Sequence, residues 1–268
     1  MRLFDSHCHL DRDPFSQDIE ACLSRAAHEN VSHMTVIGLA KSGETMDTAW
    51  NLADGHPTIW SSIGCHPHDS GDWKDEDYIR LREVAIRPKN IAIGETGLDY
   101  FYKNAPKDAQ HRRFSEHIDL AREFNQTLIC HIRDAHDDAF ELLKSKPLGP
   151  TIIHCFTGNW QEAKRYIDLG FFISFSGIVT FKGKRNESLR EAARLTPNSH
   201  IIIETDSPFL APVPHRGKPC EPAFLLQTAT YLAQLRDTPL DEFADITFQN
   251  TLKVFQLDEK SFETNQVG

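Results

Sequence analysis

Two histidines separated by one residue stand near the start of the chain, in the segment LFDSHCH at residues 3–9. Side chains at positions i and i+2 of a β-strand point to the same side, so a strand here would present His7 and His9 together and direct Cys8 away. Histidine is the commonest metal ligand in proteins. The alternative is a pair of polar residues at a ragged N-terminus, and the rest of the chain bears on this choice.

Four more ligand-type residues end apolar segments further along the chain. They are Glu95 after IAIG, His131 after TLIC, His154 after PTII and Asp206 at the end of HIIIETD. Imidazole and carboxylate together suit Zn²⁺, Mn²⁺, iron or cobalt, whereas Mg²⁺ prefers mostly oxygen ligands. If the ends of these segments meet in space, the chain has a metal site with six ligand-type residues.

The elements that position these residues alternate regularly along the chain. Apolar, strand-like segments lie at residues 3–9, 33–38, 58–65, 90–95, 127–131, 150–155, 170–176 and 200–206. Helical patterns lie at residues 16–29, 42–53, 75–86, 108–124, 137–143, 160–169, 186–195, 222–235 and 240–255. Runs such as IAIG lack polar alternation, as expected of parallel strands buried on both faces.

Eight strand-then-helix units predict an α/β fold, a closed (β/α)₈ TIM barrel, in which the carboxyl ends of all strands meet at one mouth. A doubly wound open sheet is the alternative, but no GxGxxG motif follows the first strand. No linker divides the chain. We therefore expect one TIM-barrel hydrolase domain over residues 1–268, with a polar tail from about residue 257.

Composition restricts the compartment and the partners. No apolar run approaches the roughly 18–20 residues of a membrane span, and charge appears at once in the N-terminal residues, which argues against a signal peptide. The six cysteines lack CxxC and zinc-knuckle spacing, which is typical of reduced thiols. We expect a cytoplasmic protein that is a monomer or a weak oligomer and does not bind membranes. A net charge of −10 argues against coating nucleic acid through a broad basic surface, but not against a phosphate-containing substrate.

Six ligands exceed what a single tetrahedral catalytic zinc uses. The number fits two divalent metal ions that share a carboxylate, and Glu95 is the natural bridge because it lies midway in strand order. The expected ligand sets are His7, His9 and Asp206 for one ion, and His131 with His154 for the other. Two ions about 3.5–4 Å apart can stabilise the attacking and leaving oxygens of a phosphoryl displacement and activate water. Glu95 and Asp206 are the expected catalytic residues, with Asp206 a candidate general base.

Other residues near the strand ends are candidates for substrate binding. His66 and His68 lie just after the third strand and could contact a phosphate or the leaving group; the alternative is a polar loop with a proline turn. Arg133 follows His131 by two positions and could clamp a phosphate with two parallel hydrogen bonds. Its alternative role is an ion pair with Asp134 or with carboxylates near Glu95.

Three further candidates lie on predicted loops at the rim. Tyr100 could stack on a nucleobase or simply anchor its loop. Lys182, after the seventh strand, and Arg216, after the eighth, could contact a nucleic-acid backbone, although short basic runs are more often solvated loops.

Seven short motifs occur in a fixed order between residue 3 and about residue 256. They are FDSHCHLD, GCHPH, IGETGLDY, HIRDA, HCFTG, ETDSPFL and HRGK. Together they resemble the TatD-type metal-dependent deoxyribonucleases of the amidohydrolase-like superfamily. The resemblance implies a TIM barrel, one or two divalent ions and hydrolysis of DNA phosphodiesters. It also implies that the six strand-end residues are metal ligands. Cys220 departs from the pattern, because the family usually has asparagine before Glu221-Pro222.

The function expected is a divalent-metal-dependent hydrolase that cleaves DNA phosphodiester bonds by attack of activated water, with Mg²⁺, Mn²⁺ or Zn²⁺ as cofactor. Some members of the family are similar to 3′→5′ exonucleases on single strands, and some relatives remove D-amino acids from tRNA. A D-aminoacyl-tRNA deacylase therefore remains an alternative. A small-molecule amidohydrolase or phosphotriesterase-like enzyme is another, although many such sites bridge their metals with a carboxylated lysine, and here Glu95 occupies that strand. The complete ligand set disfavours a non-catalytic binding module.

Overall fold

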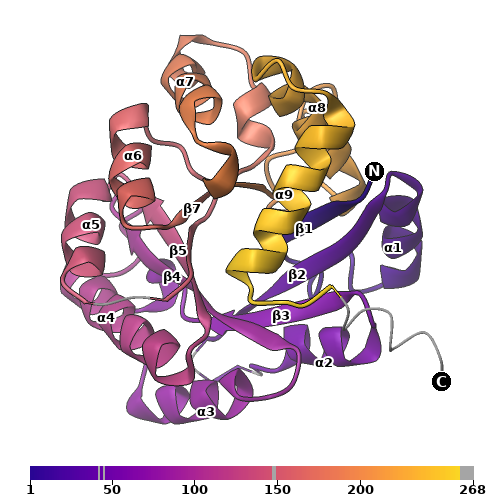
Figure 1. The fold of residues 1–268 in the computed structure, drawn as a ribbon. Coiled ribbons are helices and arrows are strands. Elements are labelled where there is room, and N and C mark those ends of the chain that lie inside the picture. Colours follow the sequence, from indigo (N-terminus) through magenta and orange to yellow (C-terminus); the bar gives the residue numbers. More distant parts are fainter. Residues whose placement is uncertain (42, 45, 147–148, 260–268) are drawn as a thin grey trace.

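An eight-stranded parallel sheet organises the computed structural model, which describes residues 1–41, 43–44, 46–146 and 149–259. The strands pair in sequence order from β1 to β8 (Figure 1). Their bounds are β1 Leu3–Cys8, β2 Val31–Leu39, β3 Ile59–Gly64, β4 Asn90–Asp99, β5 Thr127–Arg133, β6 Thr151–Ile153, β7 Phe172–Phe175 and β8 Ile201–Ile203. All eight expected strands are present, and β4 and β5 run beyond the predicted ends, to Asp99 and Arg133.

Backbone hydrogen bonds between β1 and the segment after β8 bring the two edges of the sheet together. The N–H of Asp206 donates to the carbonyl of His7 at 2.9 Å, and the N–H of His9 donates to the carbonyl of Ser207 at 2.8 Å. Cys8 and Ser207 form a parallel bridge. These contacts confirm the predicted (β/α)₈ TIM barrel and place the first and last strand ends side by side.

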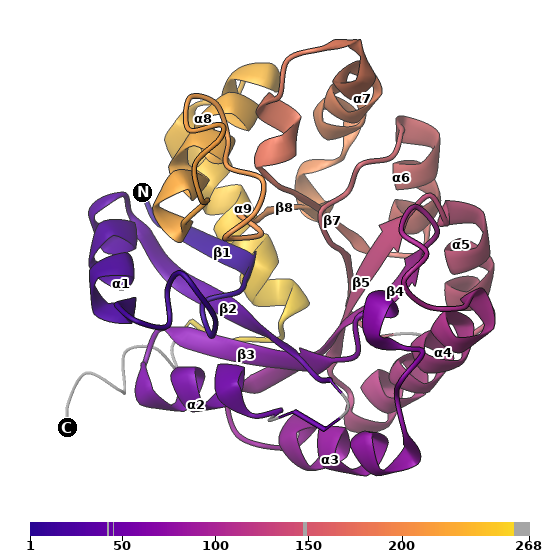
Figure 2. The ribbon, with the colours of Figure 1, turned by 180° about the vertical axis from the view of Figure 1, so that it is seen from behind.

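Helices surround the barrel (Figures 1 and 2). Their bounds are α1 Ile19–His28, α2 Thr48–Gly55, α3 Asp75–Ala85, α4 Lys107–Phe124, α5 His136–Lys144, α6 Trp160–Asp168, α7 Glu187–Leu195, α8 Leu225–Leu235 and α9 Leu240–Val254. The second predicted helix begins only at Thr48, and residues 42 and 45 of that prediction lie outside the described residues. Most of the expected polar tail, residues 260–268, does so too. No helix in the described ranges is long and apolar enough to cross a membrane.

One apolar layer fills the barrel away from the ligand-type residues. Each strand contributes one buried side chain to it: Phe4, Ile37, Trp60, Ala92, Ile129, Ile152, Phe172 and Ile202. Most of these residues lie near the start of their strands. Helix α9, which crosses the barrel in Figure 1, packs against this layer through Phe248 and Leu252. Apolar packing therefore closes the N-terminal end of the barrel. The opposite end, formed by the carboxyl ends of the strands, carries the ligand-type residues.

Candidate metal centre

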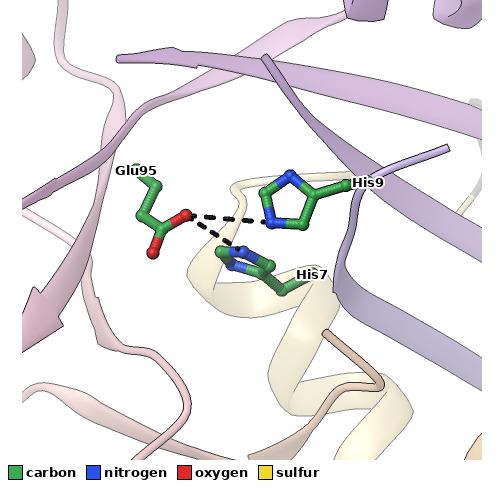
Figure 3. A group of neighbouring side chains, drawn as sticks. All are labelled: His7, His9 and Glu95. Atoms are coloured by element: carbon green, nitrogen blue, oxygen red, sulfur yellow. Dashed lines mark ion pairs between the residues drawn. The ribbon is translucent and has the colours of Figure 1, made fainter. Parts of the chain in front are cut away.

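The carboxylate of Glu95 directs its two oxygens to two different groups of ligand-type residues. Oε2 lies 3.5 Å from Nε2 of His7 and 3.9 Å from Nε2 of His9 (Figure 3). Asp206 completes this first group, because its Oδ1 lies 3.7 Å from Nε2 of His7 and 3.5 Å from Nε2 of His9. The four side chains converge on one point at the mouth of the barrel.

The other oxygen of Glu95 faces a second group. Oε1 lies 2.9 Å from Nδ1 of His131 and 2.8 Å from Nε2 of His154. Nε2 of His66 approaches the same oxygen at 3.5 Å. Glu95 thus lies between the two groups, which touch each other where the rings of His7 and His154 stack with centroids 3.9 Å apart. The structure also adds His66 to the second group.

The strands direct these residues to the mouth in two ways. His131 and His154 lie two positions after the interior residues Ile129 and Ile152, as regular alternation requires. Simple alternation from the interior Phe4 and Ala92 would instead direct His7 and Glu95 to the outer face. Register irregularities between Asp5 and Cys8 in β1, and between Ile93 and Thr96 in β4, reverse the alternation and turn both side chains inward.

Gly94 makes the irregularity in β4 possible. Its φ of +136° is unfavourable for any residue with a side chain, and a Cβ here would lie 2.5 Å from the carbonyl oxygen of Ile129. The residue that precedes Glu95 in the IGETG motif must therefore be glycine if β4 is to keep both its pairing with β5 and the inward direction of Glu95.

Burial of the first group leaves imidazole nitrogens without hydrogen-bond partners. His7 is 1 % exposed and His9 is 4 % exposed. Within the described residues, both ring nitrogens of His7 and the Nδ1 of His9 lack a hydrogen-bond partner. Burying such atoms unsatisfied costs free energy, whereas a cation at the point on which His7, His9, Glu95 and Asp206 converge would engage the facing lone pairs. Imidazole and carboxylate donors fit a divalent metal ion at this position.

The protonation of these groups suits metal binding. Burial lowers the pKa of His7 to about 4, assisted by the charge of His154, so its ring is neutral and can donate a lone pair at neutral pH. Burial alone would raise the pKa of Glu95, but the charge of His154 and the hydrogen bonds from His131 and His154 outweigh it and hold the pKa well below its usual value. Glu95 is therefore a carboxylate, and its two oxygens face the two groups of ligand-type residues.

Glu204 orients one ring of the second group. Its Oε1 lies 3.2 Å from Nδ1 of His154, and it also accepts the backbone N–H of Cys155 at 2.7 Å. Its Oε2 accepts the hydroxyl of Ser174 at 2.5 Å. Glu204 is completely buried. This carboxylate fixes the His154 ring so that Nε2 faces Glu95, the arrangement found behind many metal-bound histidines.

Asp99 has the same relation to His131. Its Oδ2 lies 3.1 Å from Nε2 of His131 and 2.9 Å from Nε2 of His68. Its Oδ1 accepts the backbone N–H groups of Phe101 at 3.0 Å and Tyr102 at 2.9 Å. Asp99 therefore orients a ligand-type ring, holds His68 at the mouth and fixes the loop after β4. Sequence analysis missed the roles of Asp99 and Glu204.

Comparisons with known proteins agree with this geometry. Residues 4–256 match the family model described as TatD related DNase. The chain is 38 % identical to the uncharacterized metal-dependent hydrolase YcfH of Escherichia coli (strain K12), over 98 % of this chain and 99 % of the relative. It is 34 % identical to the 3′-5′ ssDNA/RNA exonuclease TatD of Rahnella sp. (strain Y9602), over 95 % and 98 %. The crystal structure of YjjV, a TatD homologue from E. coli K12, superimposes with a TM-score of 0.89 at 30 % identity, covering 96 % of this chain and 99 % of that one.

The chain belongs to the TatD-related DNase family. It is accordingly a metal-dependent hydrolase with the TIM barrel of that family. The resemblance stated from the seven motifs is confirmed. The side chains that converge on Glu95 are the candidate metal ligands of this TatD-family hydrolase.

A cavity of about 930 Å³ opens above the candidate ligands of the TatD-family site. Arg133 lines it, with its guanidinium carbon 4.0 Å from the ring centroid of Phe101 and 4.9 Å from that of Tyr102. Across the part of the chain that the structure describes, the Arg133 side chain forms no ion pair or hydrogen bond, so the alternative pairing with Asp134 is not observed. Its charge is free to meet an anion in the cavity.

The other predicted substrate contacts divide between the cavity and its surroundings. His66 and His68 line the cavity. The hydroxyl of Tyr100 instead contacts Asp138 and His111, each at 2.6 Å, beside a neighbouring cavity of about 540 Å³. The aromatic side chains of this loop that reach the metal side are those of the next two residues.

The two rim cations and Cys220 lie outside the cavity lining. The Arg216 guanidinium stacks on Phe181, with its carbon 3.5 Å from the ring centroid. Lys182 is exposed. Cys220, the departure from the family pattern, is buried, and its N–H donates to the carbonyl of Pro208 at 2.9 Å. All six cysteines are free thiols.

Proposed function

We propose that the protein hydrolyses phosphodiester bonds of single-stranded DNA with two divalent metal ions, Mg²⁺, Mn²⁺ or Zn²⁺. The observation that carries this proposal is the guanidinium of Arg133, which forms no ion pair or hydrogen bond with any described residue and stacks on Phe101 and Tyr102 at the wall of the cavity that holds the Glu95 cluster. A guanidinium offers a planar fork for a phosphate, and the aromatic rings offer a face for a base. The relative from Rahnella sp. named as a 3′-5′ ssDNA/RNA exonuclease supports the same substrate class.

Divalent ions held by the two groups around Glu95 would polarise the phosphoryl oxygen and lower the pKa of the attacking water. Glu95 positions both groups relative to each other through its two oxygens. Asp206 is the candidate general base, because its side chain is 14 % exposed, more than the 4 % of Glu95, and it lines the cavity. Its carboxylate can reach water that enters from the mouth.

Arg133 would bind a non-bridging phosphate oxygen and hold the scissile bond against the two ligand groups. His68 lies close to this position, held by Asp99 and in edge contact with Tyr102 at a centroid distance of 5.3 Å. Burial lowers the pKa of His66 well below its usual value, so its ring is neutral. The neutral ring would contact either the second ligand group or the phosphate. Lys182 and Arg216 would contact only nucleotides beyond the cavity.

The same groups could serve a D-aminoacyl-tRNA deacylase, because that reaction also cleaves an ester on a nucleic acid. A free guanidinium next to the ligands favours the phosphodiester, since the scissile ester of an aminoacyl-tRNA carries no phosphate charge. A small-molecule amidohydrolase would leave Arg133 and its two aromatic neighbours without an evident role.

A substrate panel tests the proposal. Metal-free protein, with Mg²⁺, Mn²⁺ or Zn²⁺ added in turn, is given end-labelled single- and double-stranded DNA, RNA, D-aminoacyl-tRNA and a small lactone. We expect metal-dependent cleavage of single-stranded DNA that disappears in His131→Ala. The matched control His28→Ala changes an exposed histidine remote from the mouth and retains the activity. DNA cleavage that survives His131→Ala, or cleavage of D-aminoacyl-tRNA alone, would contradict the proposal.

A further inference from the structure

Phe209 is an exposed aromatic side chain fixed beside the first ligand group. The residue is 58 % exposed and lines the same cavity as Glu95. The backbone N–H of Phe209 donates to the carbonyl of Asp206 at 2.9 Å, which closes a tight turn directly after a candidate ligand. The ring meets His9 edge to face, with centroids 6.3 Å apart. A phenyl ring has no metal-ligand atom, so the metal centre does not explain an exposed apolar side chain at this position.

Phe209 lies across the mouth from Phe101 and Tyr102. Phe101 and Tyr102 follow β4, whereas Phe209 follows β8, and these strands are four positions apart in a closed eight-stranded barrel. A series of ring contacts joins the two sides through the ligands, with neighbouring centroids 3.9–6.3 Å apart: Phe209, His9, His7, His154, His131, His66, His68 and Tyr102. The candidate metal ligands therefore lie between two exposed aromatic surfaces.

The two surfaces differ in charge. The Tyr102 wall, which comprises Phe101, Tyr102 and Arg133, combines aromatic rings with a cation that has no ion-pair or hydrogen-bond partner among the described residues. The Phe209 wall comprises Phe209, Leu210 and Ile178, and all three residues line the cavity without a charge of their own. The first wall suits a base with its phosphate, and the second suits a base alone.

We infer that the site binds the nucleosides on both sides of the scissile phosphodiester by stacking one base on the Tyr102 wall and the other on the Phe209 wall. The inference rests on the proposed phosphodiesterase function and narrows its substrate. Both bases must be unpaired to stack on opposite walls, so the substrate is a single strand or a frayed end of at least two nucleotides. Phosphodiesters that lack a base on either side are poor substrates.

Dinucleoside phosphates with one cleavable bond test this directly. The substrates are thymidylyl-thymidine and its two analogues in which a tetrahydrofuran ring replaces the 5′ or the 3′ thymidine. Base stacking on aromatic side chains is worth roughly 5- to 100-fold in affinity. We therefore expect the removal of either base to lower kcat/KM of the wild-type protein by roughly this factor.

Variants separate the two walls. In Phe209→Leu, which keeps an apolar side chain but removes the aromatic face, one of the two abasic analogues should become as good a substrate as thymidylyl-thymidine. The other abasic analogue should remain a poor substrate. Tyr102→Leu combined with Phe101→Leu should give the opposite pattern. Phe209→Trp, which keeps an aromatic face, should retain both base effects. Because Phe209 is exposed, its replacement should leave the thermal unfolding temperature unchanged.

The outcomes distinguish this inference from the proposed function. Equal kcat/KM of the wild-type protein for all three substrates would overturn the inference and leave the phosphodiesterase function in place. So would two base effects that persist unchanged in Phe209→Leu. Failure of the wild-type protein with added metal to cleave any of the three would overturn both.

Discussion

Glu204 and His154 lie side by side in the barrel, with Oε1 of the carboxylate 3.2 Å from Nδ1 of the imidazole. The opposite nitrogen of the same ring faces Glu95 at 2.8 Å. Burial would lower the pKa of His154, but the two carboxylates outweigh it and raise the pKa well above its usual value. His154 is therefore protonated in the absence of metal. A divalent ion that binds to Nε2 must displace the proton on that nitrogen, and Glu204 then keeps the remaining N–H on Nδ1.

Replacing Glu204 by glutamine should weaken metal binding without unfolding the barrel. Glutamine retains an acceptor for the N–H of Cys155 but loses the charge that holds His154. We expect roughly 10- to 100-fold lower metal affinity, measured by competition with a chelator. Glu76→Gln, at an exposed position of α3, is the control. Equal metal affinities of Glu204→Gln and the wild-type protein would show that Glu204 does not orient the ligand.

Asp99→Asn should lower kcat more than it changes KM. The carboxylate holds His131 at 3.1 Å, and a neutral amide orients the ring less strongly. We expect a loss of roughly 10- to 100-fold in kcat, as is typical when the carboxylate behind a metal ligand is removed. Steady-state kinetics with a single-stranded oligonucleotide measure the effect. His68→Gln, which removes the other imidazole partner of Asp99, should cost less; a larger loss in His68→Gln would contradict this assignment.

Arg133→Ala should act mainly on substrate binding. Loss of a charge-assisted hydrogen bond to phosphate should raise KM by roughly 10- to 100-fold. Arg133→Lys should recover only part of this, because lysine lacks the planar fork that stacks on Phe101 and Tyr102. Arg112→Ala, on the exposed face of α4, serves as the control. An unchanged KM in Arg133→Ala would remove the main support for a phosphodiester substrate.

His117 should make the fold sensitive to acid. It is fully buried; its Nε2 accepts the N–H of Cys65 and its Nδ1 faces the carbonyl of Arg113. Burial lowers its pKa from 6.5 to about 4. Above pH 6.5 the His117 imidazole is neutral in both the folded and the unfolded chain. Between pH 6.5 and about 4 it takes up a proton only in the unfolded chain. The free energy of unfolding should therefore fall by about 3 kcal/mol as the pH drops through this window.

Urea unfolding of metal-free wild-type protein and His117→Gln tests this sign. Glutamine does not titrate, so the variant should lose less of its free energy of unfolding between about pH 7 and pH 4. Equal losses in both proteins would mean that His117 is not the group responsible.

Sequence reasoning located the barrel and the six ligand-type residues because apolar segments and their final polar residues are local features. His131 and Arg133 follow from alternation along a single strand. His7 and Glu95 point inward through irregularities of strand pairing, which depend on neighbouring strands and cannot be seen in one segment. The prediction that they share a mouth came from their position at segment ends, not from alternation.

The partners of the ligands were beyond that reasoning. Asp99 reaches His131 only because β4 extends four residues past Glu95, and the predicted strand stopped there. Glu204 lies two residues after the interior Ile202, so alternation could have identified it as inward-facing. Tyr100 was selected within an aromatic run whose direction depends on how Asp99 folds the loop. That fold directs the following two rings, not Tyr100, toward the cavity.

The most direct test of the account is the activity of metal-free protein reconstituted with divalent ions, compared between the wild-type protein and Glu95→Gln. Bound metal is counted in the same samples by elemental analysis. We predict about two ions per chain and cleavage of a single-stranded oligonucleotide only after metal is added. Glu95→Gln should lose both the second ion and the activity. Wild-type cleavage in the presence of a strong chelator, or full activity and metal content in Glu95→Gln, would contradict a phosphodiesterase built around this carboxylate.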